Sequence, residues 1–101
     1  MDRIRQSDLE YLAGLINQAT NSPMETLTRD ETGKLTANVG NYYISGAYGG
    51  VSLHRNVNLR GACTDVFNCG HVPKRDLYNR MRAYLAGIED SNALFLEEHY
   101  A

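Results

Sequence analysis

Residues 41–58, "NYYISGAYGGVSLHRNVN", decide the fold that the sequence predicts. Two β-forming runs flank "GAYGG", whose glycines permit positive φ, so we expect an antiparallel hairpin with Tyr48 near its tip. In the second run, the alternating positions that share one face are Val51, Leu53, Arg55 and Val57. This set is the expected buried face, and only Arg55 interrupts it. Arg55 either packs its stem at a sheet edge or meets an anion, and Tyr48 either packs back on the sheet or forms an exposed aromatic platform.

Helices are predicted before and after the β region. In residues 7–20, apolar side chains recur at i, i+3, i+4 and i+7, and Ser7 and Glu10 have the spacing of a capping box. The second helix is expected to begin at Pro73, a favoured first position, and to run to about Gly87. Its expected buried stripe consists of Leu77, Met81, Tyr84, Leu85 and Ile88.

The remaining segments complete the predicted topology. Two further β-forming runs flank "DETG" (30–33), and a last strand is expected at 62–68. The order indicates an α+β two-layer domain, in which two helices cover one face of an antiparallel sheet of three to four strands (α-β-β-β-α) and the opposite face stays partly open. We expect one domain over 1–101, with a core at about 7–89. The tail, 90–101, is expected to be a short helix capped by Ser91 or a segment that packs on a partner chain.

Composition narrows the class of protein. The chain has 101 residues, of which 43% are apolar and 22% charged, which is typical of a globular domain. Its net charge of −2 and pI of about 5.8 argue against an average non-specific nucleic-acid binder. No apolar stretch approaches the ~20 residues that a membrane span needs. Two cysteines are too few for a disulfide framework, and without a signal-like run near Met1 we expect a cytoplasmic protein.

The cysteines and histidines are candidates for metal ligands and for a nucleophile pair. Cys63, Cys69 and His71, with His54 as a fourth group, lack the short C-x2-C spacing of structural zinc sites. We therefore expect small buried thiols and no metal or cofactor. Cys69 and His71 are two residues apart, but no orienting group or oxyanion hole accompanies them in the sequence, so no enzyme is predicted.

The stretch "CGHVPKRDLY" (69–78) is the candidate anion site. Lys74 and Arg75 open a helix whose first turn carries a partial positive charge, which disfavours cations there. Further polar positions extend this flank along the helix: Tyr78, Asn79 and Arg82. The flank is either a solvated face, with Asp76 compensating, or a phosphate-binding surface.

Two resemblances accompany these residues. "NVGNYYISGAYGGVSLHRNVN" and "DVFNCGHVPKRDLYNRMRAYLAGIE" resemble a family of small uncharacterised proteins encoded by tailed bacteriophages and prophages, over about residues 7–89. That resemblance implies a phage origin and transfers no catalytic residue. The topology is also similar to that of double-stranded-RNA-binding domains, in which lysines at the last helix start hold phosphates. Here Gly70, Lys74 and Arg75 would take that part, although Leu77-Tyr78 replaces a further lysine.

Our leading hypothesis is a non-enzymatic phage accessory protein that binds an anionic, nucleotide-like ligand and sequesters a signalling nucleotide of host defence in the host cytoplasm. Tyrosines would stack a base, and cations would hold phosphates. The candidate residues are Tyr48, His54, Arg55, His71, Lys74, Arg75 and Tyr78. The alternatives are a nucleic-acid-binding protein that uses the flank of the second helix, and a structural or host-protein-binding homo-oligomer that uses the tyrosines and the tail "ALFLEEHY".

Overall fold

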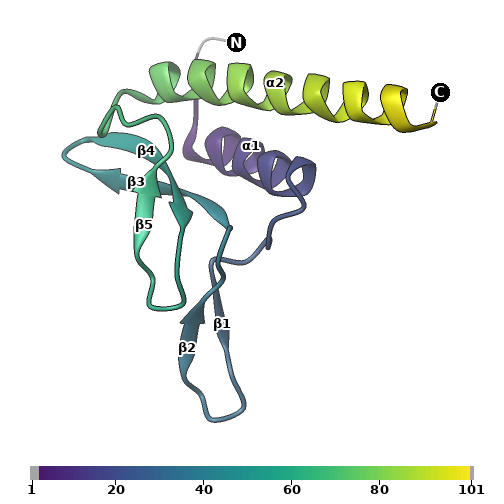
Figure 1. Cartoon of the computed structure of the whole chain (residues 1–101). Coiled ribbons are helices and arrows are strands. Elements are labelled where there is room, and N and C mark those ends of the chain that lie inside the picture. The colour runs from purple at the N-terminus through teal and green to yellow at the C-terminus, as the bar shows by residue number, and fades with distance from the viewer. Residues whose placement is uncertain (1–2, 101) are drawn as a thin grey trace.

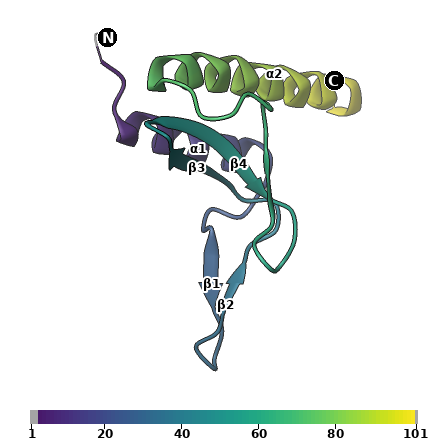
Figure 2. The ribbon, with the colours of Figure 1, turned by 90° about the vertical axis from the view of Figure 1, so that its left-hand side faces the viewer.

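The computed structural model describes residues 3–100 and has an α+β architecture, as predicted (Figure 1). Its elements are α1 (Gln6–Ala19), β1 (Leu27–Arg29), β2 (Leu35–Ala37), β3 (Tyr42–Ala47), β4 (Gly50–Asn56), β5 (Cys63–Asp65) and α2 (Lys74–Tyr100). Strands β3, β4 and β5 form an antiparallel sheet, whereas β1 and β2 form a separate two-stranded arm. The two helices run in the same direction and pack together above β3 and β4, and the arm projects away from them (Figure 2).

The core lies between the two helices and the helix-facing side of β3 and β4. The predicted stripes are confirmed: in α1 the buried apolar residues are Leu9, Leu12, Ala13 and Ile16, and in α2 they are Leu77, Met81 and Leu85, with Tyr84 and Ile88 partly buried against them. Val51 and Leu53 meet these helices from β4. Val57 was predicted to be buried but is half exposed, because β4 ends at Asn56.

The first turn of α1 differs from the prediction. The helix begins at Gln6, and Asp8 Oδ2 accepts a hydrogen bond from the Arg5 backbone N–H at 2.8 Å. Asp8 therefore closes the helix start, and the predicted Ser7–Glu10 capping box does not form. An acidic group in this position also interacts favourably with the helix dipole.

Asn17 fastens α1 to the edge of the sheet. Its Nδ2 donates to the Tyr42 carbonyl oxygen at 3.0 Å, and the Tyr42 N–H donates to Asn17 Oδ1 at 2.8 Å. The side chain is buried and replaces the hydrogen bonds that a further strand would have made at this point of β3. A buried asparagine here fixes how α1 lies along the sheet.

The predicted hairpin is confirmed in detail. Ala47 pairs with Gly50, which leaves Tyr48 and Gly49 as a two-residue turn with φ values of 53° and 75°. Positive φ at both central positions defines the hairpin turn whose twist matches that of the strands. The Tyr48 side chain is 99% exposed, so it does not pack back on the sheet.

α2 is one continuous helix, which corrects the prediction of a helix ending near Gly87 and a separate third helix. Gly87 only weakens a helix locally, and no proline follows it. Asn92 Nδ2 donates to the Ala19 carbonyl oxygen at 3.0 Å and so satisfies an acceptor at the end of α1. Ser91 lies inside the helix and is not its cap. Within residues 3–100, no helix is long and apolar enough to cross a lipid bilayer.

Candidate functional site

A short strap, residues 71–74, wraps the edge of β4 beside the hairpin turn. Val72 pairs with Val51 through two backbone hydrogen bonds: Val51 N–H to the Val72 oxygen at 2.8 Å, and Val72 N–H to the Val51 oxygen at 2.9 Å. The strap is so close to Gly50 that a Cβ atom there would lie 2.9 Å from the His71 carbonyl carbon. The predicted strand at 62–68 is thus shorter, ending at Asp65, and the chain returns to β4 through Val72.

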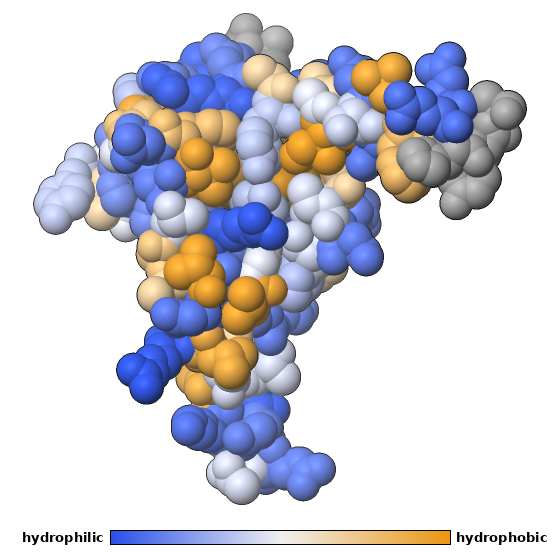
Figure 3. Space-filling model, viewed as in Figure 1, coloured by the Kyte–Doolittle hydropathy of each residue, from blue (hydrophilic) through white to orange (hydrophobic). Residues whose placement is uncertain are grey.

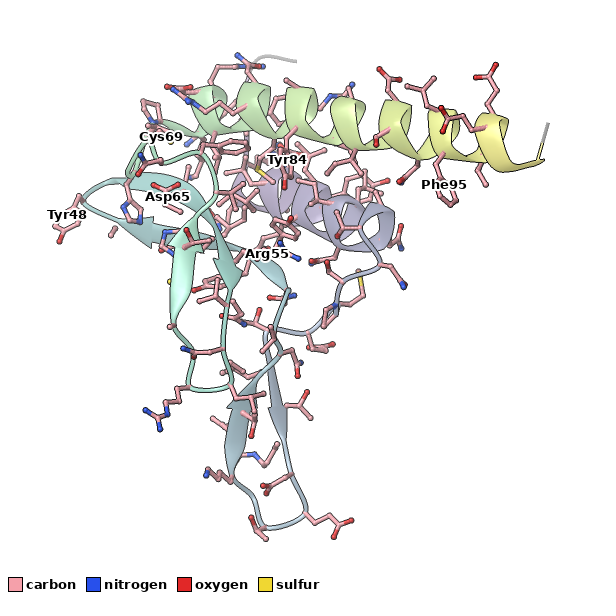
Figure 4. All side chains as sticks on the ribbon, in the orientation of Figure 1. Tyr48, Arg55, Asp65, Cys69, Tyr84 and Phe95 are labelled. Atoms are coloured by element: carbon pink, nitrogen blue, oxygen red, sulfur yellow. The ribbon has the colours of Figure 1, made fainter. Side chains whose placement is uncertain are left out.

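The open side of the sheet carries a row of four aromatic rings that ends at the turn. Ring centroids are 5.8 Å apart for Tyr43 and His54, 5.8 Å for His54 and His71, and 6.0 Å for His71 and Tyr48, all in edge-to-face contact. Ser45 Oγ lies 3.2 Å from His71 Nε2, which orients that imidazole. Figure 4 shows Tyr48 at the tip of the hairpin and Asp65 nearer the middle of the molecule. We call these rings the ring row.

A partly buried carboxylate, Asp65, lies opposite His54 of the ring row. Burial raises the pKa of the Asp65 carboxyl, but the net pKa is below its ordinary value, because Gly70 N–H donates to Oδ2 at 2.8 Å and other neighbours act in the same direction. Those neighbours are the Ser52 hydroxyl, the Phe67 N–H and His54. Asp65 is therefore charged at neutral pH.

Two further polar atoms of this region are buried without a hydrogen-bond partner among the described residues. Asp65 Oδ1 and Ser52 Oγ are buried, and neither makes a hydrogen bond within the described part of the chain, although Ser52 is near enough to lower the pKa of Asp65. Burial, and then the neighbouring His71, lower the pKa of His54, while Asp65 opposes them. His54 is therefore neutral at pH 7. Buried polar groups normally pair, and Ser52 and Asp65 are close enough to be partners of one another.

The other side of the turn holds a cationic cavity of about 590 Å³. Both helices begin at its wall, α1 at Gln6 and α2 at Lys74, so two partial positive charges of helix dipoles meet there. Lys74 and Arg3 add two formal charges. The full lining is Arg3, Ile4, Gln6, Gly46, Ala47, Gly49, Gly50, Val51, Pro73 and Lys74. A second cavity of about 390 Å³ beside α1 has Glu10 as its only charged lining residue and does not suit an anion.

The structure brings together three of the seven candidate residues and places a fourth on the other side of the hairpin turn. Tyr48, His54 and His71 belong to the ring row, and Lys74 lies at the cavity, three residues along the strap from His71. Sequence reasoning missed Tyr43, which shares the outward parity of β3 and pairs with His54 across the strands. That parity was the signal that could have identified it. Burial, and then Cys63, raise the pKa of the Tyr43 phenol to about 12.

The other three candidates lie elsewhere. Arg55 is on the helix-facing side, where its guanidinium lies 4.9 Å from the Tyr42 ring centroid and Nε donates to the Gly40 oxygen at 3.2 Å (Figure 4). These contacts match the structural alternative for that residue. The Arg75 guanidinium lies 5.8 Å from the ring centroid of Tyr78, and Tyr78 packs partly against the core. Neither of these two residues lines the cavity.

The cysteines differ from the expectation of buried thiols. Cys63 is exposed, and its Sγ lies 3.4 Å from His54 Nδ1, while Cys69 is partly buried with its Sγ 3.4 Å from the Gly70 oxygen. Within the described residues, no three His, Cys, Asp or Glu side chains are gathered closely enough to hold a metal ion. In the register of β4 and β5, Asp65 is opposite His54 and Cys63 is opposite Asn56. Cys63 is therefore the diagonal neighbour of His54 on the same face of the sheet.

Comparison with known proteins found no family model, no curated protein and no solved structure that matches this chain.

Proposed function

We propose that this protein binds a phosphate-bearing, nucleotide-like ligand at the β3–β4 turn. The observation that carries the proposal is the junction, at Tyr48 and Gly49, of a cationic cavity on one side with a row of aromatic rings on the other. The phosphate would occupy the cavity, and the base would lie against the ring row. A nucleotide combines these two chemistries in one molecule.

The cavity is suited to phosphate for electrostatic reasons. Lys74 is disfavoured at the start of α2 by the helix dipole, and an anion bound between the two helix starts would reverse that cost. Arg3, in the segment that precedes α1, lines the same cavity. Gly49 leaves its backbone accessible to an approaching phosphate oxygen, because it carries no side chain and no atom beyond its chain neighbours lies within 4 Å of its Cβ position.

The ring row supplies a recognition surface for a flat base. The exposed Tyr48 ring offers an apolar face, and His71 and the neutral His54 offer ring nitrogens for hydrogen bonds. The proposal is of binding without turnover. With the phage origin that the resemblance implies, such a protein would sequester a host signalling nucleotide in the host cytoplasm.

Isothermal titration calorimetry with cyclic mononucleotides, cyclic dinucleotides and ADP-ribose tests the proposal. We expect binding by one of these classes, a loss of at least about tenfold in affinity for Arg3→Glu with Lys74→Glu, and a smaller loss for Tyr48→Ala. Arg82→Glu is the control for each single reversal, because it makes the same charge change per residue on exposed α2 surface outside the cavity. Absence of heat with every probe would overturn the proposal.

Nucleic-acid binding is a second candidate, favoured by one observation. The two parallel helices on one side of the sheet, with the hairpin turn beside the start of α2, follow the arrangement that motivated the comparison with double-stranded-RNA-binding domains (Figure 1). In that case the whole basic flank of α2 would contact phosphates, so Arg82→Glu would weaken duplex RNA retention in a gel-shift assay. Affinity would also fall steeply with salt. No retention at low salt eliminates this candidate.

A further inference from the structure

The C-terminal part of α2 extends beyond the rest of the fold. Asn92 donates a hydrogen bond to Ala19 at the end of α1, and we call the residues that follow it, 93–98, the overhang. The buried stripe of α2 continues into this segment, because Phe95 and Leu96 follow Asn92 at i+3 and i+4. The exposed fractions are 61% for Leu94, 54% for Phe95 and 56% for Leu96. The helix thus carries its apolar face past the point where α1 covers it.

The overhang is also strongly acidic. From Ala83 to the end of the printed sequence there is no Lys or Arg, whereas Glu89, Asp90, Glu97 and Glu98 are all acidic. The end of a helix carries a partial negative charge, which disfavours acidic side chains in the last turns. A surface that covers the overhang must therefore combine apolar side chains with cations.

Such a surface exists on the same chain, on the β1–β2 arm. The loop at 57–61 lies along β2, fixed by the Ala37 N–H, which donates to the Leu59 oxygen at 3.2 Å. Between them is a groove of about 600 Å³, which we call the arm groove. Its exposed apolar side chains are Leu27, Leu35 and Leu59, and its cations are Lys34 and Arg60. Figure 3 shows apolar surface gathered over this part of the arm.

The shape of the chain keeps these two surfaces apart. Its radius of gyration is 15.1 Å, and its extents are 47 × 38 × 22 Å. A compact domain of this length has a radius of gyration of about 13 Å. The overhang and the arm project in different directions, so one chain cannot bring them together within this fold (Figure 1). Two projections with complementary chemistry are suited to contact between copies.

We propose that the overhang of one copy binds in the arm groove of a second copy. Leu94 would pack on the leucines of the groove. Glu97 and Glu98 follow Leu94 at i+3 and i+4 and share its face of α2, so they would lie against Lys34 and Arg60. The second copy is the indicated partner, because the charge and the apolar content of the two surfaces match. The two surfaces are different, so the contact either is exchanged in a closed assembly or repeats from copy to copy.

Sedimentation velocity of the full chain measures this association directly. We expect an assembly of two or more copies for the unmodified protein, and monomers for Leu94→Glu with Leu96→Glu. Circular dichroism of that variant should keep the helical content, because both side chains are exposed in the single chain. Tyr11→Ser removes an equally exposed aromatic ring from α1 and is the matched control, with an unchanged assembly expected.

Charge reversal identifies the partner surface. Glu97→Lys with Glu98→Lys, and separately Lys34→Glu with Arg60→Glu, should each weaken association by about tenfold or more. Combining the two reversals should restore most of the lost affinity, because the opposite charges then face each other again. A monomeric unmodified protein at millimolar concentration would overturn the proposal. So would an assembly that survives either reversal, or one rescued by reversal of Lys74 and Arg75 in place of the groove cations.

Discussion

Replacing Gly50 by alanine tests how the strap holds the site together. The added Cβ atom would lie 2.9 Å from the His71 carbonyl carbon and 3.0 Å from both the nitrogen and the oxygen of Val72. These are backbone atoms, so the clash cannot be relieved by rotating a side chain. The strap must move away from β4, which stretches the two hydrogen bonds between Val51 and Val72.

The magnitude follows from those contacts. Losing two backbone hydrogen bonds costs about 1–3 kcal/mol, at roughly 0.5–1.5 kcal/mol each. Forcing a packed region apart costs about 1–3 kcal/mol more, although partial relaxation makes the two contributions overlap. We therefore expect Gly50→Ala to lower the free energy of unfolding by about 2–4 kcal/mol, out of roughly 5–15 kcal/mol for a domain of this size.

Urea unfolding followed by circular dichroism measures this loss, and Gly46→Ala is the matched control. Gly46 lies in the same hairpin, but a Cβ there would be 3.9 Å from the Gly50 oxygen, an ordinary contact. Alanine at position 46 should leave stability unchanged or raise it by about 0.5 kcal/mol, because it restricts the unfolded chain. If Gly50→Ala unfolds at the same urea concentration as Gly46→Ala, and the Val72 amide keeps its protection from hydrogen exchange, the close approach of the strap is refuted.

Three further outcomes are expected. Asn17→Ala should destabilise the protein by about 2–4 kcal/mol in urea unfolding, because it leaves the buried N–H and carbonyl oxygen of Tyr42 without partners. A loss below about 1 kcal/mol would contradict the anchoring role of Asn17. Tyr84→Phe should cost about 0.5–1.5 kcal/mol in the same assay by removing the 2.9 Å contact between the Tyr42 and Tyr84 hydroxyls. Burial raises the pKa of Tyr43 and Tyr84 from 10 to about 12, so these phenols stay neutral in the folded protein while the unfolded chain ionises. These two phenols therefore add no pH dependence below about pH 10, and stability should fall as the pH rises from 10 through about 12. Tyrosinate absorbance and urea midpoints measured across that range check the sign, and stability that rises there would refute it.

Local patterns predicted most of the fold. The period of apolar residues identified the buried stripes of α1 and α2, and the glycines around Tyr48 identified the hairpin. The same reasoning was wrong about the end of α2, because a single glycine weakens a helix by only about 1 kcal/mol and packing against α1 outweighs it. It was also wrong about Val57, since strand parity does not say where a strand ends.

The candidate site was harder to predict from the sequence than the fold. Tyr48, His54 and His71 were chosen for their chemistry, and the register of the sheet with the return of Val72 to β4 placed their rings in one row. Arg55 was a candidate because its cation could bind an anion, but it faces the helices. Tyr43 and Arg3 were missed, because their importance depends on neighbours that are distant in the sequence.

The sequence by itself determined the charge of α2 at both ends. Lys74 and Arg75 open the helix, and Glu97 and Glu98 lie near its end, so both ends oppose the helix dipole. Only the tertiary structure decided where those charges lie: Lys74 lines a cavity beside a second helix start and Arg75 does not, while the acidic end projects past α1. The difference lies in how far along the chain each effect acts. Helix period, capping and dipole act within a few residues, whereas a cavity or an uncovered surface arises from packing between segments far apart in the chain.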